Sequence, residues 1–187
     1  MSAISNFLTS PRPISSGVKE IHFIRETGNP INKKRKKPYF GLLHHASDWC
    51  LLSDIGSQLK FPSHIAENIS NRPDIVIFSD IGKILIFIEL TSPCEENFEE
   101  RHKQKFNRYG PNSDIFRACQ KNGWEVYVFP VEVGARGYAA TSLQFCLSRL
   151  GMPWKTVTTT VKLCSDAALR SSFWIWTSFL ESSPDNQ

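Results

Sequence analysis

The stretch RPDIVIFSDIGKILIFIELT, residues 72–91, contains two apolar runs separated by Ile81 and Gly82. β-Branched and aromatic residues dominate both runs, which favours strands, and the Ile-Gly pair between them favours a hairpin turn. An acid stands at each end, because Asp74 begins the first run and Glu89 lies near the end of the second. Burying a carboxylate is costly unless it is paired or binds a metal. The placement of these two acids therefore decides how the hairpin folds and what it can do.

The register of the hairpin brings the two acids together. With the Ile-Gly pair at the tip, Ser79 pairs with Ile84, and Asp74 pairs with Glu89. Directly opposed residues of an antiparallel pair point to the same face, with Cβ atoms roughly 4.5–5.5 Å apart. Like charges at that distance repel each other, but oxygen ligands at the same spacing can chelate Mg²⁺ or Mn²⁺. A single bulged residue would instead place the acids on opposite faces.

The next segment, residues 92–110, is predicted to be a helix that carries a lysine to these acids. Its acidic residues come early, its basic residues come late, and a Gly-Pro pair ends it. At about 100° per residue, Lys105 lies about 20° from Phe98 and about 40° from Tyr109, the aromatic residues expected to pack on the sheet. Lys103 points away from that face. Lys105 either covers apolar surface with its stem or reaches the acids.

Each of these three residues also has a purely structural interpretation. A Pro-Asp pair before a strand is common turn chemistry. A glutamate near a strand end is usually solvated, and a lysine on a helix face usually covers apolar surface. The functional interpretation depends on the coincidence that Asp74, Glu89 and Lys105 fall on one predicted surface.

The rest of the chain predicts an α/β fold, with a central mixed sheet and helices on its faces. Further strands are expected at residues 18–26, 46–56 and 124–133, and short helices at 61–68 and 113–123. Residues 141–180 are expected to form extra C-terminal helices, with breaks at Gly151 and Pro153. The expected domain spans residues 18–182, between a disordered tail at 1–17 and a short tail at 183–187.

Positive charge is concentrated in one run. The 187 residues include 22 Lys and Arg against 18 Asp and Glu, a net charge of +4. Five of these basic residues form KKRKK at 33–37, and without them 17 basic side chains face 18 acidic ones. Like charges in a row repel one another, which predicts a solvated loop at 33–38. Such a loop fits either a non-specific DNA contact or a nuclear import signal.

Other classes of protein lack their usual signals here. The five cysteines are scattered and form no zinc or disulfide spacing. No apolar run is long enough for a signal peptide or a membrane span, so a soluble protein is expected, in the nucleus or otherwise in the cytoplasm. The histidines at 44, 45 and 102 are candidate proton carriers, although the sequence pattern does not indicate which residues would act with them. The aromatic segment FWIWTSF, residues 173–179, is expected to be core or interface rather than a base-stacking surface, because its aromatics recur at helical spacing.

The residues Pro73-Asp74, followed after fourteen residues by Glu89-Leu90-Thr91, resemble the PD-(D/E)xK nuclease signature. That family usually has a lysine two residues after the second acid, where this chain has Thr91. In the similar restriction-like endonuclease domains of non-LTR retrotransposons, the lysine comes from the following helix, where Lys105 stands. Several longer segments also resemble an uncharacterised animal family associated with this nuclease type and with retroelements: GLLHHASDW, DIGSQLKFP, NRPDIVIFS, IELTSPCEE, KQKFNRY, PVEVGARGY and SDAALRSSFWIW.

This resemblance implies a restriction-endonuclease-like core and a metal-dependent DNA endonuclease of retroelement origin. Asp74 and Glu89 would bind Mg²⁺ or Mn²⁺ together with the Leu90 backbone carbonyl, and Lys105 would orient water or offset developing charge. Asp54 is the first candidate for a further acid, and Glu67 is the second. The expected nucleic-acid contacts are Lys33, Lys34, Arg35, Lys36, Lys37, Arg101, Arg108 and Arg136.

Three interpretations remain open. The chain is either this nuclease or a catalytically inactive nucleic-acid-binding or interaction module on the same fold, which Thr91 favours. A third interpretation is an unrelated globular protein whose acids are structural. A homodimer is compatible with each of them.

Overall fold

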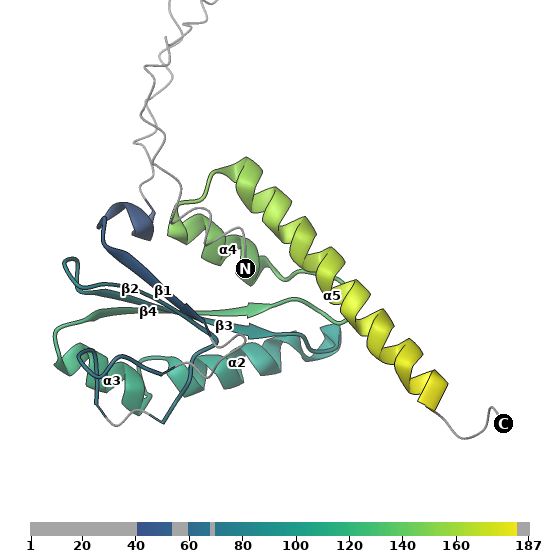
Figure 1. The fold of residues 1–187 in the computed structure, drawn as a ribbon, viewed down its shortest axis with the longest axis horizontal. Helices are drawn as coiled ribbons and strands as arrows, with labels where there is room; N and C mark the ends of the chain where they lie inside the picture. Colours follow the sequence, from purple (N-terminus) through teal and green to yellow (C-terminus); the bar gives the residue numbers. More distant parts are fainter. Residues whose placement is uncertain (1–40, 54–59, 68–69, 183–187) are drawn as a thin grey trace, which may run out of the picture. The chain divides into compact units, whose positions relative to one another are not determined.

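The computed structural model describes residues 41–53, 60–67 and 70–182, which are built around a four-stranded sheet (Figure 1). Its strands, in spatial order, are β1 (Trp49–Ser53), β2 (Ile75–Ser79), β3 (Ile84–Thr91) and β4 (Glu125–Glu132). The first three are antiparallel neighbours, and β4 joins β3 in parallel. The sheet is therefore mixed, as predicted.

The β2–β3 hairpin has the register that the sequence predicts. Ser79 pairs with Ile84, and Ile75 pairs with Ile88. Asp48 stabilises the tip, because its carboxylate accepts hydrogen bonds from the Ser79 hydroxyl at 2.5 Å and from the Ile81 amide at 2.9 Å. These bonds, the one from Ser79 first, lower the pKa of Asp48. No bulge interrupts the pairing between Ile75 and Ile88, so the loop parity on which the acid pair depends is confirmed.

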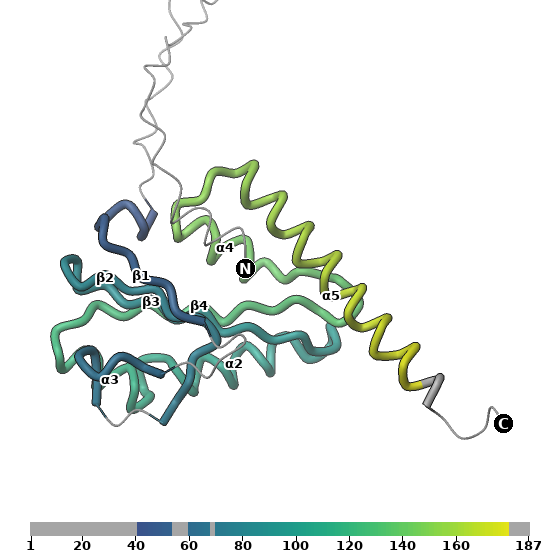
Figure 2. Tube along the Cα trace, viewed as in Figure 1, coloured from purple at the N-terminus to yellow at the C-terminus, as the bar shows by residue number. Residues whose placement is uncertain are grey.

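Helices cover both faces of the sheet (Figures 1 and 2). One face carries α2 (Phe98–Tyr109), preceded by the 3₁₀ turn η2 (Glu95–Asn97), and α3 (Asp114–Lys121). The other face carries α4 (Thr141–Leu150) and α5 (Trp154–Ser182), and the 3₁₀ turn η1 (Leu42–His44) lies beside α4. Parallel neighbours need a long crossover connection, and α2 with α3 supplies it between β3 and β4. In this crossover α2 packs mainly on β4 and also contacts β3, the strand that bears Glu89.

The main core lies between the sheet and the α2–α3 layer. Val76 and Phe78 from β2 and Leu85 and Phe87 from β3 pack there against Tyr109 and residues of α3. Ser113 caps α3, because its hydroxyl accepts a hydrogen bond from the Phe116 amide. Alternate residues of each strand face this core, and the residues between them face the opposite helical layer. Because β2 lies between the two helical layers, it is buried along its whole length.

Several predicted boundaries differ from the structure. The helix expected at 61–68 is wrong: residues 63–65 form a turn in which the Ile65 and Ala66 amides bond the Pro62 carbonyl. The adjacent apolar residues Ile65 and Ala66 enter the core together, which needs a turn rather than a helical face. The helix expected from residue 92 begins as η2 at Glu95, because the chain ahead of it is bound to the segment after β4 by the hydrogen bond from the Ala135 amide to the Pro93 carbonyl.

The C-terminal helices and their break follow the prediction. α4 ends at Leu150 and is followed by Gly151, whose φ of 95° suits glycine, and Pro153 precedes α5. None of the described helices is both long and apolar enough to cross a membrane. The expected tails at 1–17 and 183–187, the strand at 18–26 and the basic loop at 33–38 lie outside the described residues.

Candidate functional site

Asp74 and Glu89 lie side by side where β2 begins. The Asp74 amide donates a hydrogen bond to Glu89 Oε1 at 3.1 Å. In return, the Leu90 amide donates a hydrogen bond to Asp74 Oδ2 at 2.7 Å. Through these two hydrogen bonds between backbone amides and carboxylates, the contact between the two strands continues one residue beyond the pair Ile75 and Ile88. They confirm that the two acids are neighbours.

Lys105 reaches both acids from α2. Its Nζ lies 2.9 Å from Glu89 Oε2 and 3.3 Å from Asp74 Oδ2. Tyr109, one turn later on the same face, is buried, and its hydroxyl donates a hydrogen bond to the Arg72 carbonyl at 3.0 Å. Lys103 points outward and pairs with Glu99 at the surface. The helical phase expected for these residues is confirmed, because Tyr109 fixes α2 with Lys105 directed at the hairpin.

Burial controls the electrostatics of this cluster. Glu89 is 0% exposed, and its burial raises its pKa to about 7, with the hydrogen bond from Lys105 lowering it and the charge of Asp74 raising it further. Burial acts to lower the pKa of the Lys105 ammonium, but the hydrogen bonds and charges of Glu89 and Asp74 outweigh it, so the pKa of Lys105 is raised. Two carboxyl groups thus share one ammonium, and when both are ionised the cluster keeps a net negative charge.

A polar groove of about 550 Å³ opens beside the cluster, between α2 and the segment that follows β3. Arg101, Lys105 and Arg108 recur at helical spacing along its α2 wall. The opposite wall comes from residues 91–94. Three basic side chains in one groove favour an anionic ligand, and the predicted residues Arg101 and Arg108 therefore share a surface with Lys105.

Other predicted site residues lie elsewhere. Arg136 forms ion pairs with Glu95 at 2.6 Å and with Glu96 at 2.5 Å, and its hydrogen bond lowers the pKa of Glu95. Glu67 is exposed beyond the 63–65 turn. Asp54 and the basic residues Lys33, Lys34, Arg35, Lys36 and Lys37 lie outside the described residues.

A second buried acid, Glu132, was missed by the sequence reasoning. It is 2% exposed, and it accepts hydrogen bonds from the Ser142 hydroxyl at 2.6 Å and from His102 Nδ1 at 3.1 Å. It stands in β4, beside Thr91 in the ladder. An acid within the apolar run WEVYVFPVEV is the same kind of signal that singled out Glu89, and it would have found Glu132 as well. His102 consequently has the partner that its sequence position did not reveal.

Two further cavities border this region. One of about 700 Å³ lies on the side of α2 that bears His102 and is lined by aromatic side chains, among them Phe98, Tyr138 and Phe145. The other, of about 910 Å³, is apolar and lies between α5 and the ends of β3 and β4. The polar groove beside Lys105 is the one lined by basic side chains, so it suits an anion best.

Within the described ranges, no group of three or more His, Cys, Asp or Glu side chains is arranged to hold a metal ion. The oxygen ligands that the cluster itself offers are therefore the carboxylates of Asp74 and Glu89. No protein-family model matches the chain, and no curated protein matches it. The family resemblance therefore rests on the residues quoted from the sequence.

Proposed function

We propose that the protein is a metal-dependent DNA endonuclease that hydrolyses phosphodiester bonds, with Asp74, Glu89 and Lys105 at its centre. The observation that carries this proposal is that Lys105 Nζ lies within 3.3 Å of a carboxylate oxygen of each acid, while Glu89 is fully buried. Nuclease centres of this kind combine acids that hold a cation with a basic group that faces the reacting phosphate.

The donor set fits a hard divalent cation. Mg²⁺ is commonly held by one or two carboxylates, with the remaining positions taken by waters and substrate phosphates. Asp74 and Glu89 would hold Mg²⁺ or Mn²⁺, and the Leu90 backbone carbonyl is the expected further ligand. When bound, the ion supplies Lewis-acid polarisation of a phosphate and a more acidic water.

The protein's own residues have two tasks in this proposal. Lys105 donates hydrogen bonds at the acid pair, so it is placed to orient a water or to offset charge on a phosphate oxygen. Arg101 and Arg108 line the adjoining groove and are suited to hold the DNA backbone. The basic run at 33–37 is expected to add DNA contacts or direct the protein to the nucleus.

The restriction-endonuclease-like core and the retroelement origin belong to the same proposal. Their support is the arrangement in which an antiparallel hairpin carries both acids, the next helix supplies the lysine, and a parallel strand follows. Thr91 remains where the family usually has its lysine, and it lines the groove that Lys105 also lines.

A second function, a catalytically inactive DNA-binding module, is favoured by a different aspect of the same contacts. The Lys105 ammonium itself bridges the two carboxylates, so it already supplies the positive charge that a metal ion would bring. In such a module the three residues stabilise the end of the hairpin, and the groove binds phosphate without cleavage.

Nicking of supercoiled plasmid with and without Mg²⁺ tests the first function against the second. We expect wild-type protein to nick DNA with Mg²⁺, and Asp74→Asn and Lys105→Met to lose that activity. Lys103→Met is the matched control, because Lys103 lies on the same helix but pairs with exposed Glu99. DNA binding by electrophoretic shift is measured in parallel.

Each outcome has a distinct meaning. Mg²⁺-dependent nicking that survives in Lys103→Met and is lost in the other two variants supports the nuclease. DNA binding without nicking in the wild type supports the inactive module. If the wild type neither binds nor cuts DNA, both functions are excluded and the acids are structural.

A further inference from the structure

Helix α5 is packed at its beginning and exposed over most of its length. Val157 and Thr160 are buried where α5 lies against α4. From residue 161 to residue 179, no α5 residue is buried. Helices in proteins depend on tertiary packing for most of their stability, so 19 consecutive unburied positions call for a partner.

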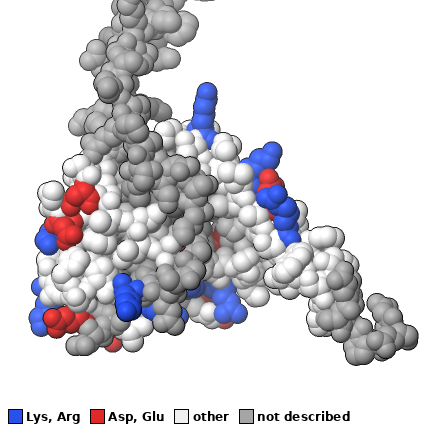
Figure 3. All heavy atoms as spheres, viewed as in Figure 1, with Lys and Arg blue, Asp and Glu red and all other residues white. Residues whose placement is uncertain are grey.

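Large apolar side chains project from every side of the far end of α5, between small polar residues at 171, 172, 177 and 178. Phe173, Trp174, Ile175, Trp176 and Phe179 are each between 57% and 71% exposed. No charged residue occurs from Ser171 to Leu180. In Figure 3 the part of α5 next to its grey end is white, beyond the blue and red side chains further up the helix. A helix that is apolar on all sides is normally buried on all sides.

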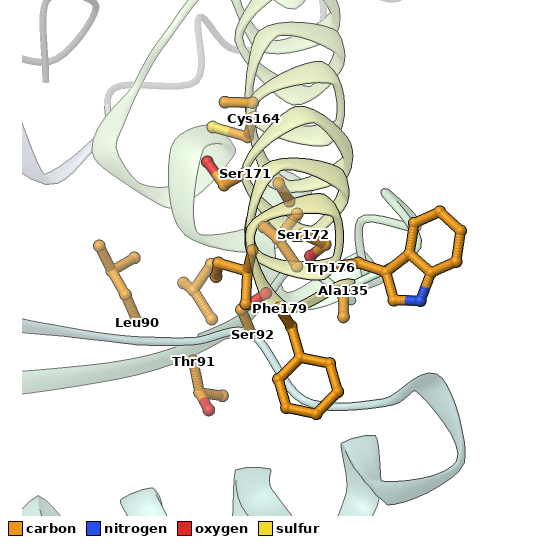
Figure 4. A pocket seen from close by; sticks show the side chains of 14 residues that line it. Leu90, Thr91, Ser92, Ala135, Cys164, Ser171, Ser172, Trp176 and Phe179 are labelled. Carbon is orange, nitrogen blue, oxygen red and sulfur yellow. The ribbon is translucent and has the colours of Figure 1, made fainter. Parts of the chain in front are cut away.

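One side of this helix end borders an apolar groove of about 910 Å³ (Figure 4). Leu90, Val131 and Val133 form its sheet wall, and Ala168, Trp176 and Phe179 are among the α5 residues of its other wall. At about 100° per residue, Phe173 projects from the side of α5 opposite this groove, and Trp174 projects from a side that adjoins it. The same chain therefore presents both an apolar cavity and an aromatic projection that nothing in the described residues fills or covers.

We propose that this protein is a homodimer in which the α5 segment 169–179 of each copy packs into the groove of the other copy. A two-fold interface buries the same patch on both subunits, and a patch that contains both a projection and a cavity can satisfy this condition. The occupant of the groove is thus a second copy of the chain. This inference does not depend on the nuclease proposal, because it uses the apolar side chains of α5 and of the strand ends and none of the charged groups of Asp74, Glu89 and Lys105. Leu90 is common to both: it lines the groove, and its backbone carbonyl is the expected metal ligand.

The exposed apolar area approaches what a stable interface needs. Four aromatic side chains of about 150–250 Å² each, all more than half exposed, supply about 400–600 Å². Leu169, Ile175 and the groove walls extend this toward the roughly 800 Å² per partner that specific interfaces bury. The absence of charge from Ser171 to Leu180 agrees with the depletion of charged residues at interface centres. It also disfavours DNA as the occupant, because DNA binding relies on Lys and Arg.

Sedimentation velocity and light scattering of the full chain over a concentration series test the dimer. We expect wild-type protein to be dimeric at about 50 µM. Trp174→Glu removes the projection and Ala168→Trp fills the groove, and each should raise the dissociation constant at least about 30-fold, as expected for a hot-spot contact. Trp154→Glu is the matched control, because Trp154 is 68% exposed on the same helix but lies 20 residues away. It should leave the dimer unchanged.

A mixture of the two disrupting variants adds a sharper readout. In a mixed dimer, the intact projection of the Ala168→Trp copy faces the intact groove of the Trp174→Glu copy. The mixture should therefore associate more strongly than either variant alone. Circular dichroism confirms that each variant is folded. A monomeric wild type at about 50 µM, a dimer insensitive to both variants, or equal loss of the dimer in Trp154→Glu overturns the proposal. Co-sedimentation of monomeric protein with phosphatidylcholine vesicles would overturn it in favour of a lipid surface.

Discussion

Glu89 and Glu132 are buried acids in adjacent strands, and α2 supplies a nitrogen partner to each. Lys105 reaches Glu89, and His102 reaches Glu132. The surroundings differ: Glu89 shares its ammonium with Asp74 beside a basic groove, whereas each oxygen of Glu132 accepts its own donor, from His102 or Ser142. Burial alone therefore does not mark a functional acid. The Glu89 cluster has two acids for one base and can attract a further cation, while Glu132 is already satisfied.

The largest expected difference between the two glutamates is in catalysis. Glu89→Gln should reduce Mg²⁺-dependent nicking more than about 100-fold, because it removes a proposed metal ligand and a charge at the reacting centre. Glu132→Gln should leave the nicking rate within a few-fold of wild type. Initial rates on supercoiled plasmid measure both. Equal loss in the two variants would show that the contrast between the two sites is wrong.

Stability should depend on pH through Glu89. Burial raises the pKa of Glu89 from 4.5 to about 7, so between these values the folded protein binds more protons than the unfolded chain. The free energy of unfolding of the metal-free protein should therefore fall as the pH rises from about 4.5 to about 7, by about 2–3 kcal/mol from this group. Below pH 4.5 the contribution is constant.

Urea unfolding of wild-type protein and of Glu89→Gln at several pH values isolates this effect. The free energy of unfolding of Glu89→Gln should increase relative to that of the wild type as the pH rises, because glutamine carries no titrating proton. A difference that is independent of pH from 4.5 to 7 would contradict the raised pKa of Glu89.

Removal of the other glutamate should affect stability through its partners. Glu132→Ala should destabilise the protein by about 2 kcal/mol, because it leaves the Ser142 hydroxyl without its acceptor and opens a small cavity. The double variant Glu132→Ala with Ser142→Ala should cost less than the sum of the two single changes. Thermal or urea unfolding measures both. Additive losses would mean that the hydrogen bond contributes nothing.

The smallest effect is expected at the third acid–base pair of α2. Lys103 and Glu99 lie 2.6 Å apart, but both side chains are mostly exposed. Lys103→Met should leave the free energy of unfolding nearly unchanged, because solvent screens such a pair. Urea unfolding beside Lys105→Met makes the comparison. A larger loss at Lys103 than at Lys105 would mean that the exposed ion pair stabilises the protein more than the buried cluster does.

Much of the candidate site could be predicted because it depends on local periodicity. The pairing of Ser79 with Ile84 follows from a loop of fixed length, and the same register brings Asp74 to Glu89. Lys105 reaches the pair because helical geometry fixes its direction relative to Tyr109. The turn at 63–65 was missed, because its hydrogen bonds to Pro62 and the joint burial of Ile65 and Ala66 depend on the core into which they pack.

The sequence by itself determined the hairpin, the helix after it and the break at Gly151, since each depends on residues close together in the chain. Only the tertiary structure decided which distant side chains meet. It joined Glu132 to His102 and Ser142, and it turned Arg136 toward Glu95. It also left the apolar end of α5 without cover in the described residues. Such contacts depend on how helices and strands pack across the sheet, and no spacing along the chain specifies that packing.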